Sequence, residues 1–323
     1  YDAEMSSVFF QDLAIPAPNV HLGVGSGSHG EQTGEMIKRL EPVLAKNAPD
    51  WVLLYGDTNS TLAGAIVCAK LGIPVAHIEA GLRSFNRAMP EEINRIVADH
   101  LSDVLFCPTA AAMRNLETEG LAARAVLCGD VMYDAVNHYR RRAEDCGGPL
   151  AEQWKPGTFI LATVHRAENT DDPSRLRHIF AALERIARHI CPVVLPLHPR
   201  TKKMLVSAGI ELCHVTVIRP LSYLEMLLLE VRARFILTDS GGVQKEAYFA
   251  KVPCVTLRSE TEWVETLENR CNILGGTDED VIIEAVTADV ARGPWSAAYG
   301  NGDAGRAILS ALAERRSTAV SKL

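Results

Sequence analysis

Short apolar runs alternate with amphipathic stretches along this sequence, and that alternation restricts the fold more than any other feature. Residues 51–55, 74–78 and 104–107 are three such runs in the first half of the chain. Each is followed by a stretch with helical spacing, which is typical of parallel strands connected by helices. The sequence therefore predicts an α/β protein. In the first half, the pattern predicts strands at 20–24, 51–55, 74–78, 104–107 and 125–128 and helices at 31–46, 60–71, 90–100, 109–119 and 131–143.

The alternation restarts after residues 146–149, a Cys-Gly-Gly-Pro segment that reads as a linker. Beyond it the pattern predicts a helix at 173–189 and strands at 159–164, 192–197, 215–218, 234–238 and 254–257. A chain of 323 residues is long enough for two hydrophobic cores. We expect two doubly wound, Rossmann-like domains, residues 1–148 and 149–323, with a central cleft and a last helix that crosses back to the first domain.

Composition excludes several classes of function. The net charge of -7 and the absence of a basic run argue against a nucleic-acid partner. No apolar stretch is long enough to span a bilayer, so we expect no membrane partner. The eight cysteines are scattered singly, which favours reduced core thiols in a cytoplasmic protein over disulfides or a metal site.

Three carboxylates are predicted to meet at one edge of the first sheet. Asp57 and Glu79 directly follow two apolar runs, and Glu91 lies in the first turn of the next helix. Ligands of such sheets bind outside the carboxyl ends of the strands. Each carboxylate alone could simply cap a helix. Together they favour acid–base catalysis, because crowded carboxylates shift one another's pKa. Arg83 and Arg95 beside them indicate a charged substrate.

The segment Ser240-Gly241-Gly242 follows an apolar run and opens a helix. Glycines allow close approach of a ligand to the backbone, and free N–H groups at a helix start bind phosphate. Glu246 lies one turn into that helix, within reach of a ribose hydroxyl. The alternative is a tight turn between strand and helix without a ligand.

Two histidines follow strands of the second domain at the same edge. His165 ends the run 159–164 and His198 ends the run 192–197. A histidine at a strand end is often only a satisfied polar group, but this edge is where ligands bind. Neither has companions at metal-ligand spacing, so we expect no metal.

Residues 25–30 match the G-x-G-x-x-G pattern of dinucleotide-binding turns. That pattern needs an acidic residue at the end of the next strand, about 20 positions on. Asp50 precedes the strand instead, and Asp57 belongs to its own motif. We therefore expect a flexible glycine-rich loop over the cleft and not a site for NAD.

Six segments occur in an order that is similar to a known family. They are Gly-Asp-Thr-Asn-Ser-Thr at 56–61, His-Ile-Glu-Ala-Gly-Leu-Arg-Ser at 77–84, Pro-Glu-Glu-Ile-Asn-Arg at 90–95, His-Arg-Ala-Glu-Asn at 165–169, His-Pro-Arg-Thr at 198–201 and Thr-Asp-Ser-Gly-Gly at 238–242. Together they resemble the non-hydrolysing UDP-N-acetylglucosamine 2-epimerase family, from residue 1 to about residue 276. The resemblance implies a two-domain fold of the glycosyltransferase-B type with its site in the cleft.

The resemblance also implies roles for individual residues. The implied catalytic residues are Asp57, Glu79, Glu91 and His165, and the implied substrate-binding residues are Arg95, Ser240, Gly241, Gly242 and Glu246. To the second set we add Arg83 and His198 from their positions.

The implied enzyme inverts carbon 2 of a UDP-linked 2-acetamido sugar without a cofactor. It eliminates UDP to give a 2-acetamidoglycal, then adds UDP back with a proton on the other face, for synthesis of cell-surface polysaccharide precursors. A homodimer is expected. A hydrolysing epimerase and a UDP-sugar glycosyltransferase of the same fold are the alternatives.

Two features differ from the common family pattern. The sequence enters after the strand and Gly-x-Arg-Pro turn with which the family normally starts. Residues 1–6 also replace a segment that many bacterial members use to bind UDP-N-acetylglucosamine as an activator, and Asp2 there predicts that no activator is needed. With residues 84–86 and 261–263, this start resembles the branch acting on UDP-2,3-diacetamido-2,3-dideoxyglucuronate and archaeal members.

Overall fold

The computed structural model describes residue 10, residues 12–288 and residues 292–320. The chain forms two compact units, the first made of residues 1–135 and 297–323 and the second of residues 136–296. The division falls inside helix α6 (Val131–Asp145), whereas the expected domain boundary at 148/149 lies at the start of α7 (Gly148–Gln153). The predicted linker is wrong at Gly148 and Pro149, because proline suits a first helical turn and both residues belong to α7.

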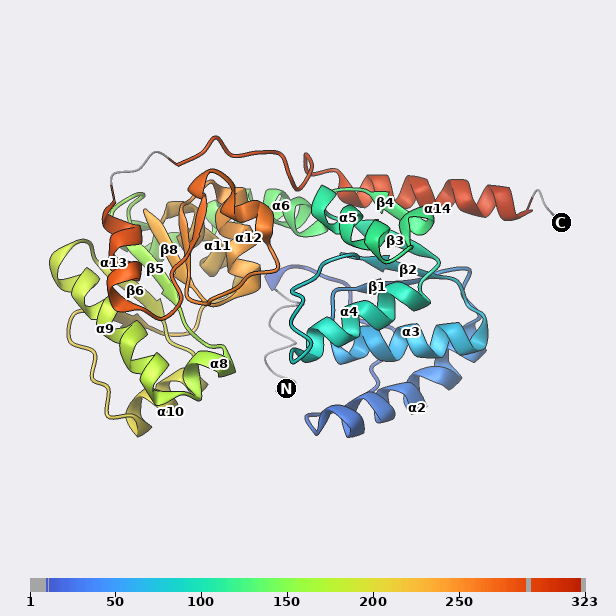
Figure 1. Ribbon diagram of the computed structural model, residues 1–323, viewed down its shortest axis with the longest axis horizontal. Helices are drawn as coiled ribbons and strands as arrows, with labels where there is room; N and C mark the ends of the chain where they lie inside the picture. Colours follow the sequence, from blue (N-terminus) through green and yellow to red (C-terminus); the bar gives the residue numbers. More distant parts are fainter. Residues whose placement is uncertain (1–9, 11, 289–291, 321–323) are drawn as a thin grey trace. The chain divides into compact units, whose positions relative to one another are not determined.

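The first unit contains a parallel sheet in the order β1-β2-β3-β4. Its strands are β1 (Val52–Tyr55), β2 (Val75–Ile78), β3 (Val104–Cys107) and β4 (Ala125–Leu127), and its helices are α2 (His29–Asn47), α3 (Asn59–Leu71), α4 (Pro90–Leu101), α5 (Ala110–Thr118) and α14 (Ala304–Val320), with the first turn of α6. Within this unit, α3 and α4 lie on one face of the sheet (Figure 1). On the other face, Ile308 and Leu312 of α14 pack against Ile78 and Phe106.

The strand predicted at residues 20–24 is wrong. In the described part of the first unit, β1 pairs only with β2, and no strand forms at 20–24. Val20 is half exposed, so it buries too little apolar surface to stabilise a strand at this position. The glycine-rich run that follows is a loop only as far as Ser28, which caps α2 through its side chain, and His29 already begins the helix. The strand that a dinucleotide-binding turn requires therefore does not precede it.

The second unit contains a parallel sheet in the order β10-β9-β8-β5-β6-β7. Its strands are β5 (Ile160–Thr163), β6 (Val193–Pro196), β7 (Thr216–Ile218), β8 (Phe235–Thr238), β9 (Cys254–Thr256) and β10 (Asn272–Leu274), and its longer helices are α9 (Pro173–His189), α10 (Pro199–Ser207), α11 (Tyr223–Arg232), α12 (Gly241–Ala250) and α13 (Glu279–Thr287). One face packs against α9 and α13, and the other against α11 and α12. Strand order reverses between β5 and β8, which is the ligand-binding position of doubly wound sheets.

Composition led to two expectations that the structure addresses, namely that the cysteines are reduced core thiols and that no segment spans a bilayer. All eight cysteines are free thiols. The prediction that all lie in the core is wrong for Cys146 and Cys213, which are exposed because they lie in a helix-to-helix turn and in a loop. None of the described helices combines the length and the apolar composition that crossing a bilayer requires.

Candidate active site

Asp57 lies in the turn between β1 and α3. Gly56 adopts a φ of 65° there, which a residue with a side chain rarely reaches, and the chain can then turn away from the sheet edge. Arg95 donates to Asp57 Oδ2 through both Nε and Nη2, at 3.0 and 2.7 Å. The third guanidinium nitrogen donates to the buried Glu92 at 2.9 Å. Arg95 therefore holds the Asp57 carboxylate in one orientation while about a third of that side chain stays accessible.

Amide side chains fix the backbone of the same turn. Asn94 donates from Nδ2 to the Asp57 carbonyl at 2.8 Å and to Asn59 Oδ1 at 3.3 Å. Asn59 in turn donates to Gln32 Oε1 at 2.8 Å and lies 3.2 Å from His29 Nδ1. Helices α2, α3 and α4 are thus connected around the turn, which makes it rigid before any ligand binds.

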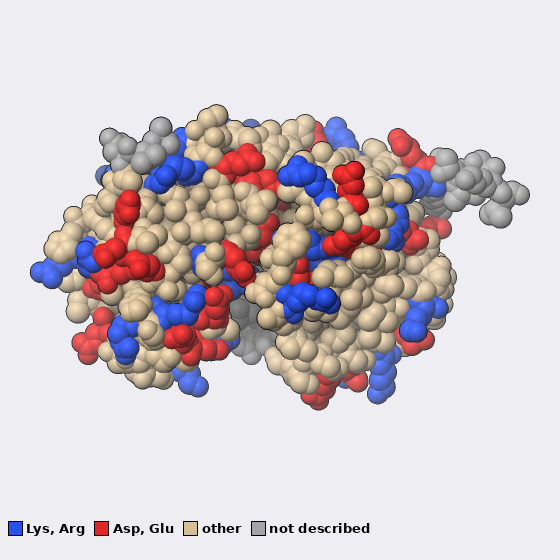
Figure 2. Space-filling model, in the orientation of Figure 1, with Lys and Arg blue, Asp and Glu red and all other residues tan. Residues whose placement is uncertain are grey.

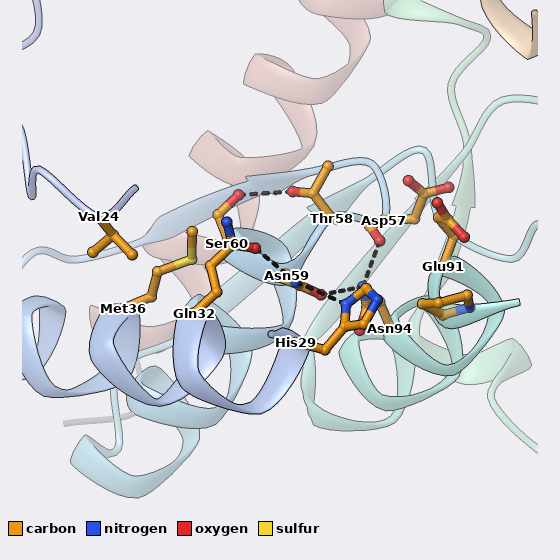
Figure 3. A pocket seen from close by; sticks show the side chains of 11 residues that line it. Val24, His29, Gln32, Met36, Asp57, Thr58, Asn59, Ser60, Glu91 and Asn94 are labelled. Carbon is orange, nitrogen blue, oxygen red and sulfur yellow. Dashed lines mark hydrogen bonds between the residues drawn. The ribbon is translucent and has the colours of Figure 1, made fainter. Parts of the chain in front are cut away.

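A pocket of about 450 Å³ opens beside this turn. It is lined by Val24, His29, Gln32, Met36, Asp57, Thr58, Asn59, Ser60, Pro90, Glu91 and Asn94, all in the first unit. Figure 3 shows the Asp57 and Glu91 side chains at the same end of it. The volume suits a small polar ligand such as a sugar.

Glu79 directly follows β2 and has a φ of 73°, a conformation that residues other than glycine seldom adopt. A Cβ atom placed on Gly56 would lie 3.5 Å from Glu79 Oε2, so this carboxyl group lies over the turn that carries Asp57. Such backbone strain is common at functional sites. The structure thus brings Asp57 together with Glu79 on one side and with Glu91 in the pocket.

Arg83 lies in a buried polar network behind these residues. Its Nε and Nη2 donate to both oxygens of Glu119 at 2.7 Å, and Nη1 donates to Asp99 at 2.8 Å and to the Leu82 carbonyl at 2.7 Å. Asp99 also contacts His77 Nδ1 at 2.7 Å. The Arg83 guanidinium is therefore hydrogen-bonded to groups of the protein itself, whereas a substrate-binding cation would keep donors available for the substrate.

In the second unit, His165 follows β5 and contacts Asp239, which follows β8. His165 Nδ1 lies 3.2 Å from Asp239 Oδ1. The backbone N–H groups of His165 and Arg166 and the side chain of Asn169 also donate to this carboxylate, at 3.0 to 3.1 Å. Burial alone would raise the pKa of Asp239, but the hydrogen bonds and the charge of His165 together lower it. An ionised Asp239 then orients the imidazole with Nε2 away from the carboxylate.

His198 lies on a second pocket with His165. This pocket, of about 230 Å³, is lined by Thr163, Val164, His165, Pro196, His198, Pro220, Leu221, Met226 and Val243. His198 caps α10, and its Nδ1 accepts from the Arg200 N–H at 3.2 Å. Burial and the nearby charges of His165 and Arg200 lower the pKa of His198. A neutral His198 therefore presents a single N–H donor, on Nε2.

The start of α12 is formed by Ser240, Gly241 and Gly242, with Ser240 as the N-cap. A Cβ atom on Gly241 would lie 3.0 Å from Glu262 Oε1 and 3.1 Å from Trp263 Nε1. Glycine is required here because a larger residue would have to displace these side chains. The indole N–H of Trp263 is buried and has no hydrogen-bond partner among the described residues.

Glu246 lies further along α12 and is almost fully buried. Burial raises its pKa to about 7, against the lowering effects of a hydrogen bond from Tyr223 and the charge of Lys245. Lys245 itself lies 4.0 Å above the Trp263 ring. Glu230 of α11 is completely buried beside Glu246, and burial and that neighbour raise its pKa as well. The region holds two neighbouring buried carboxyl groups whose pKa values are both raised.

Two further residues of these sites carry a sequence signal. His77 interrupts an otherwise apolar strand, and Asp239 directly follows one, which is the rule that selected Asp57 and Glu79. Asp99 had no local signal, because its partners are 16 and 22 residues away. In the part of the chain that the structure describes, no group of three or more His, Cys, Asp or Glu could hold a metal ion.

The fold and these sites define a class. Two parallel sheets, each with its polar site residues after the strands, form an α/β protein of the glycosyltransferase-B type. A solved structure of a trehalose 6-phosphate synthase from Burkholderia multivorans shares this fold with a TM-score of 0.54 at 13% identity.

The comparison with family models gives the particular family. Residues 1–313 match the model described as UDP-N-acetylglucosamine 2-epimerase. The chain belongs to this family, as its motifs predicted, and it is an isomerase that acts on nucleotide sugars.

Individual relatives cover nearly the whole chain. A UDP-2,3-diacetamido-2,3-dideoxy-D-glucuronate 2-epimerase from Pseudomonas aeruginosa is 50% identical over 97% of this chain and 89% of its own length. A UDP-N-acetylglucosamine 2-epimerase homolog from Methanococcus maripaludis is 47% identical over the same shares. The structure of Methanocaldococcus jannaschii UDP-GlcNAc 2-epimerase in complex with UDP-GlcNAc and UDP matches with a TM-score of 0.89 and 43% identity, over 97% of this chain and 90% of that one.

Proposed function

We propose that this enzyme inverts carbon 2 of a UDP-linked 2-acetamido sugar in the synthesis of cell-surface polysaccharide precursors, with UDP-2,3-diacetamido-2,3-dideoxyglucuronate as its preferred substrate. The observation that carries the proposal is the meeting of Asp57, Glu79 and Glu91 beside a pocket of sugar size. The choice of sugar rests on the identity with the Pseudomonas aeruginosa relative.

Carboxylates suit this chemistry. The proton on carbon 2 of the sugar is too weakly acidic for simple removal, so elimination of UDP must accompany its loss. Return of the proton to the opposite face needs a second proton-transfer group. Asp57, Glu79 and Glu91 offer three candidates at one sheet edge, and Arg95 holds Asp57 in one orientation. Activity measurements on a variant of each carboxylate would show which one removes the proton.

The UDP group is assigned to the second unit. The start of α12 offers backbone N–H groups for a diphosphate, and beside it lies the Trp263 N–H, which has no hydrogen-bond partner among the residues that the structure describes. His165, oriented by Asp239, can contact a phosphate through Nε2 or serve in catalysis. Glu246 is our candidate for the ribose hydroxyls, and His198 for a further contact on the His165 pocket. Arg83 supports Asp99 from within the protein, so we assign it a positioning role.

The test is incubation of the protein with a single UDP-sugar and no acceptor. We expect interconversion of the two carbon-2 epimers while the amount of UDP-sugar stays constant, followed by NMR. Stoichiometric release of UDP and free sugar would indicate a hydrolysing epimerase. Turnover that requires an acceptor would indicate a glycosyltransferase. Initial rates with the diacetamido uronic acid and with UDP-N-acetylglucosamine then test the choice of substrate.

Further expectations belong with this proposal. We expect a homodimer, to be checked by light scattering, and a cytoplasmic location. A nucleic-acid partner is not expected, and Figure 2 shows acidic and basic side chains interspersed over the face in view. Asp2 and the absence of an activator concern residues outside those that the structure describes, and kinetics with added UDP-N-acetylglucosamine would test them.

A further inference from the structure

His77 is a completely buried polar side chain in the middle of the first sheet. It lies in β2, where every residue is buried, and its exposed fraction is 0%. Its Nε2 lies 2.8 Å from the Gly56 carbonyl oxygen and its Nδ1 lies 2.7 Å from Asp99 Oδ1. Both ring nitrogens are therefore used, and neither faces a pocket.

The two partners determine the protonation of the ring. A carbonyl oxygen only accepts, so Nε2 must carry a proton. A carboxylate oxygen also only accepts, so Nδ1 must carry a proton as long as Asp99 is ionised. Both conditions are met only by the imidazolium form. A neutral His77 would require a proton on Asp99.

The surroundings of Asp99 favour its ionised form. Its Oδ2 accepts from the Gly81 N–H at 3.1 Å and from Arg83 Nη1 at 2.8 Å. Burial raises the pKa of Asp99, but the contacts with His77 and Arg83 outweigh burial and lower it. For His77, burial lowers the pKa, and Asp99, the Gly56 carbonyl and the charge of Glu79 together raise it.

Other titratable groups near the pair do not change this balance. Glu119 holds the far side of Arg83 at 2.7 Å, and His100 lies 3.4 Å from Glu119 at the surface. Cys107 of β3 also lies near Asp99, and burial and that charge raise the thiol pKa to about 12, so it stays neutral. In this group, the cationic side chains of Arg83 and His77 face the carboxylates of Asp99 and Glu119.

The position of the pair connects it to the reaction. His77 is hydrogen-bonded to the carbonyl oxygen of Gly56, the residue before Asp57. Asp99 accepts a hydrogen bond from the N–H of Gly81, two residues after Glu79. The buried contact between His77 and Asp99 therefore links the turn that carries Asp57 to the turn that carries Glu79. We propose that His77 is a permanently charged positioning residue that, with Asp99, fixes the turns of Asp57 and Glu79 and places a buried positive charge behind them. This role rests on the proposed epimerase reaction.

The protonation state can be measured without any substrate. In protein labelled with ¹⁵N in the histidine rings, we expect both His77 nitrogens to stay protonated as the pH rises above 6.5, the ordinary pKa of histidine. An Asp99→Asn variant keeps the shape but removes the charge, so its His77 ring should lose a proton at a lower pH. A single protonated ring nitrogen in the unchanged protein at neutral pH would overturn the proposal.

The positioning role is tested by kinetics. His77→Gln should lower kcat by about tenfold to a hundredfold with little change in KM, because UDP is held by the other unit. His178→Gln, an exposed histidine on α9, is the control and should keep normal rates. A charged His77 together with unchanged kcat and an unchanged pH profile in His77→Gln would overturn the role. If the unchanged protein does not epimerise any UDP-sugar, the proposed function fails instead, whatever the NMR shows.

Discussion

Asp57, Glu79 and Glu91 have different surroundings although they lie at one edge. Arg95 holds Asp57 with two hydrogen bonds to one oxygen. Glu79 itself has a strained backbone φ of 73°, and Glu91 lies in the first turn of α4. Different environments are what allows neighbouring carboxyl groups to act as acid and base.

We therefore expect Asp57→Asn, Glu79→Gln and Glu91→Gln each to lower turnover by at least about a hundredfold. Each change keeps the size of the side chain and removes its ability to exchange a proton. UDP affinity, measured by calorimetry, should stay near normal, and Glu117→Gln on the exposed side of α5 is the control. Near-normal turnover in all three variants would show that the carboxylates have another role.

Glu246 gives a pH-dependent stability. Its folded pKa of about 7 exceeds the ordinary 4.5, so the native state holds this proton more tightly than the unfolded state. Stability from this residue is thus present below about pH 4.5 and is lost as the pH rises through about 7, a loss of about 3 kcal/mol. Glu246→Gln should reduce the loss between pH 5 and pH 8 in urea unfolding, while Glu211→Gln, an exposed control, should not. Equal pH slopes in both variants would contradict this.

Sequence reasoning could find the residues whose positions follow from a general rule. Side chains that come after the strands of a parallel sheet lie at the same edge of that sheet. Asp57 and Glu79 follow apolar runs, and chain position alone brings them to one edge. Their partners are different. Asp99 and Arg95 lie on an ordinary amphipathic helix, and only the packing of α4 against the sheet shows which acidic and basic side chains turn inward.

At the scale of elements, the tight start of α12 predicts a sharp effect of one methyl group. In Gly241→Ala, the added Cβ would lie 3.0 Å from Glu262 Oε1 and 3.1 Å from Trp263 Nε1, so these two side chains would have to move by a few tenths of an ångström. We expect UDP affinity to fall by at least about tenfold and stability to fall by about 1–3 kcal/mol. Gly34→Ala on α2, where a Cβ meets nothing within 4 Å, is the matched control. Unchanged UDP affinity in a folded Gly241→Ala protein would mean that this turn is only structural.

Strands β1, β2 and β5 were predictable because apolar residues dominate them, and they correspond to the runs at 51–55, 74–78 and 159–164. The run at 20–24 also contains His21 and Gly23, its residues are exposed or half-buried, and no strand forms there among the described residues. Strand β10 was missed because it has only three residues, Asn272 among them.

At the scale of the molecule, the chain enters the first unit twice. Residues 297–323 return to it, and α14 covers one face of the first sheet through Ile308 and Leu312. Asp134 accepts from the Ala304 and Gly305 N–H groups at 3.1 and 2.8 Å, which fixes the start of α14. The sequence suggested a helix that crosses back, but not which face of the sheet that helix covers.

This connectivity predicts that the two units differ when they are produced separately. Residues 136–296 are continuous and contain the whole second sheet, so we expect this fragment to fold cooperatively and to bind UDP weakly. Residues 1–135 lack α14. Loss of Ile308 and Leu312 costs about 2–5 kcal/mol for each side chain, which is most of the stability of an ordinary domain. This fragment should therefore fail to show a cooperative thermal transition by circular dichroism.

Joining residues 297–323 to residue 135 through a flexible linker should restore that transition, because the sheet regains its cover. The same fusion with Ile308→Asp and Leu312→Asp is the control, since it keeps the linker and the length but removes the apolar contact. A cooperative transition in residues 1–135 alone would show that α14 is dispensable for folding. An unfolded fragment 136–296 would show instead that the second unit depends on the first, although its own sheet and both layers of helices are complete.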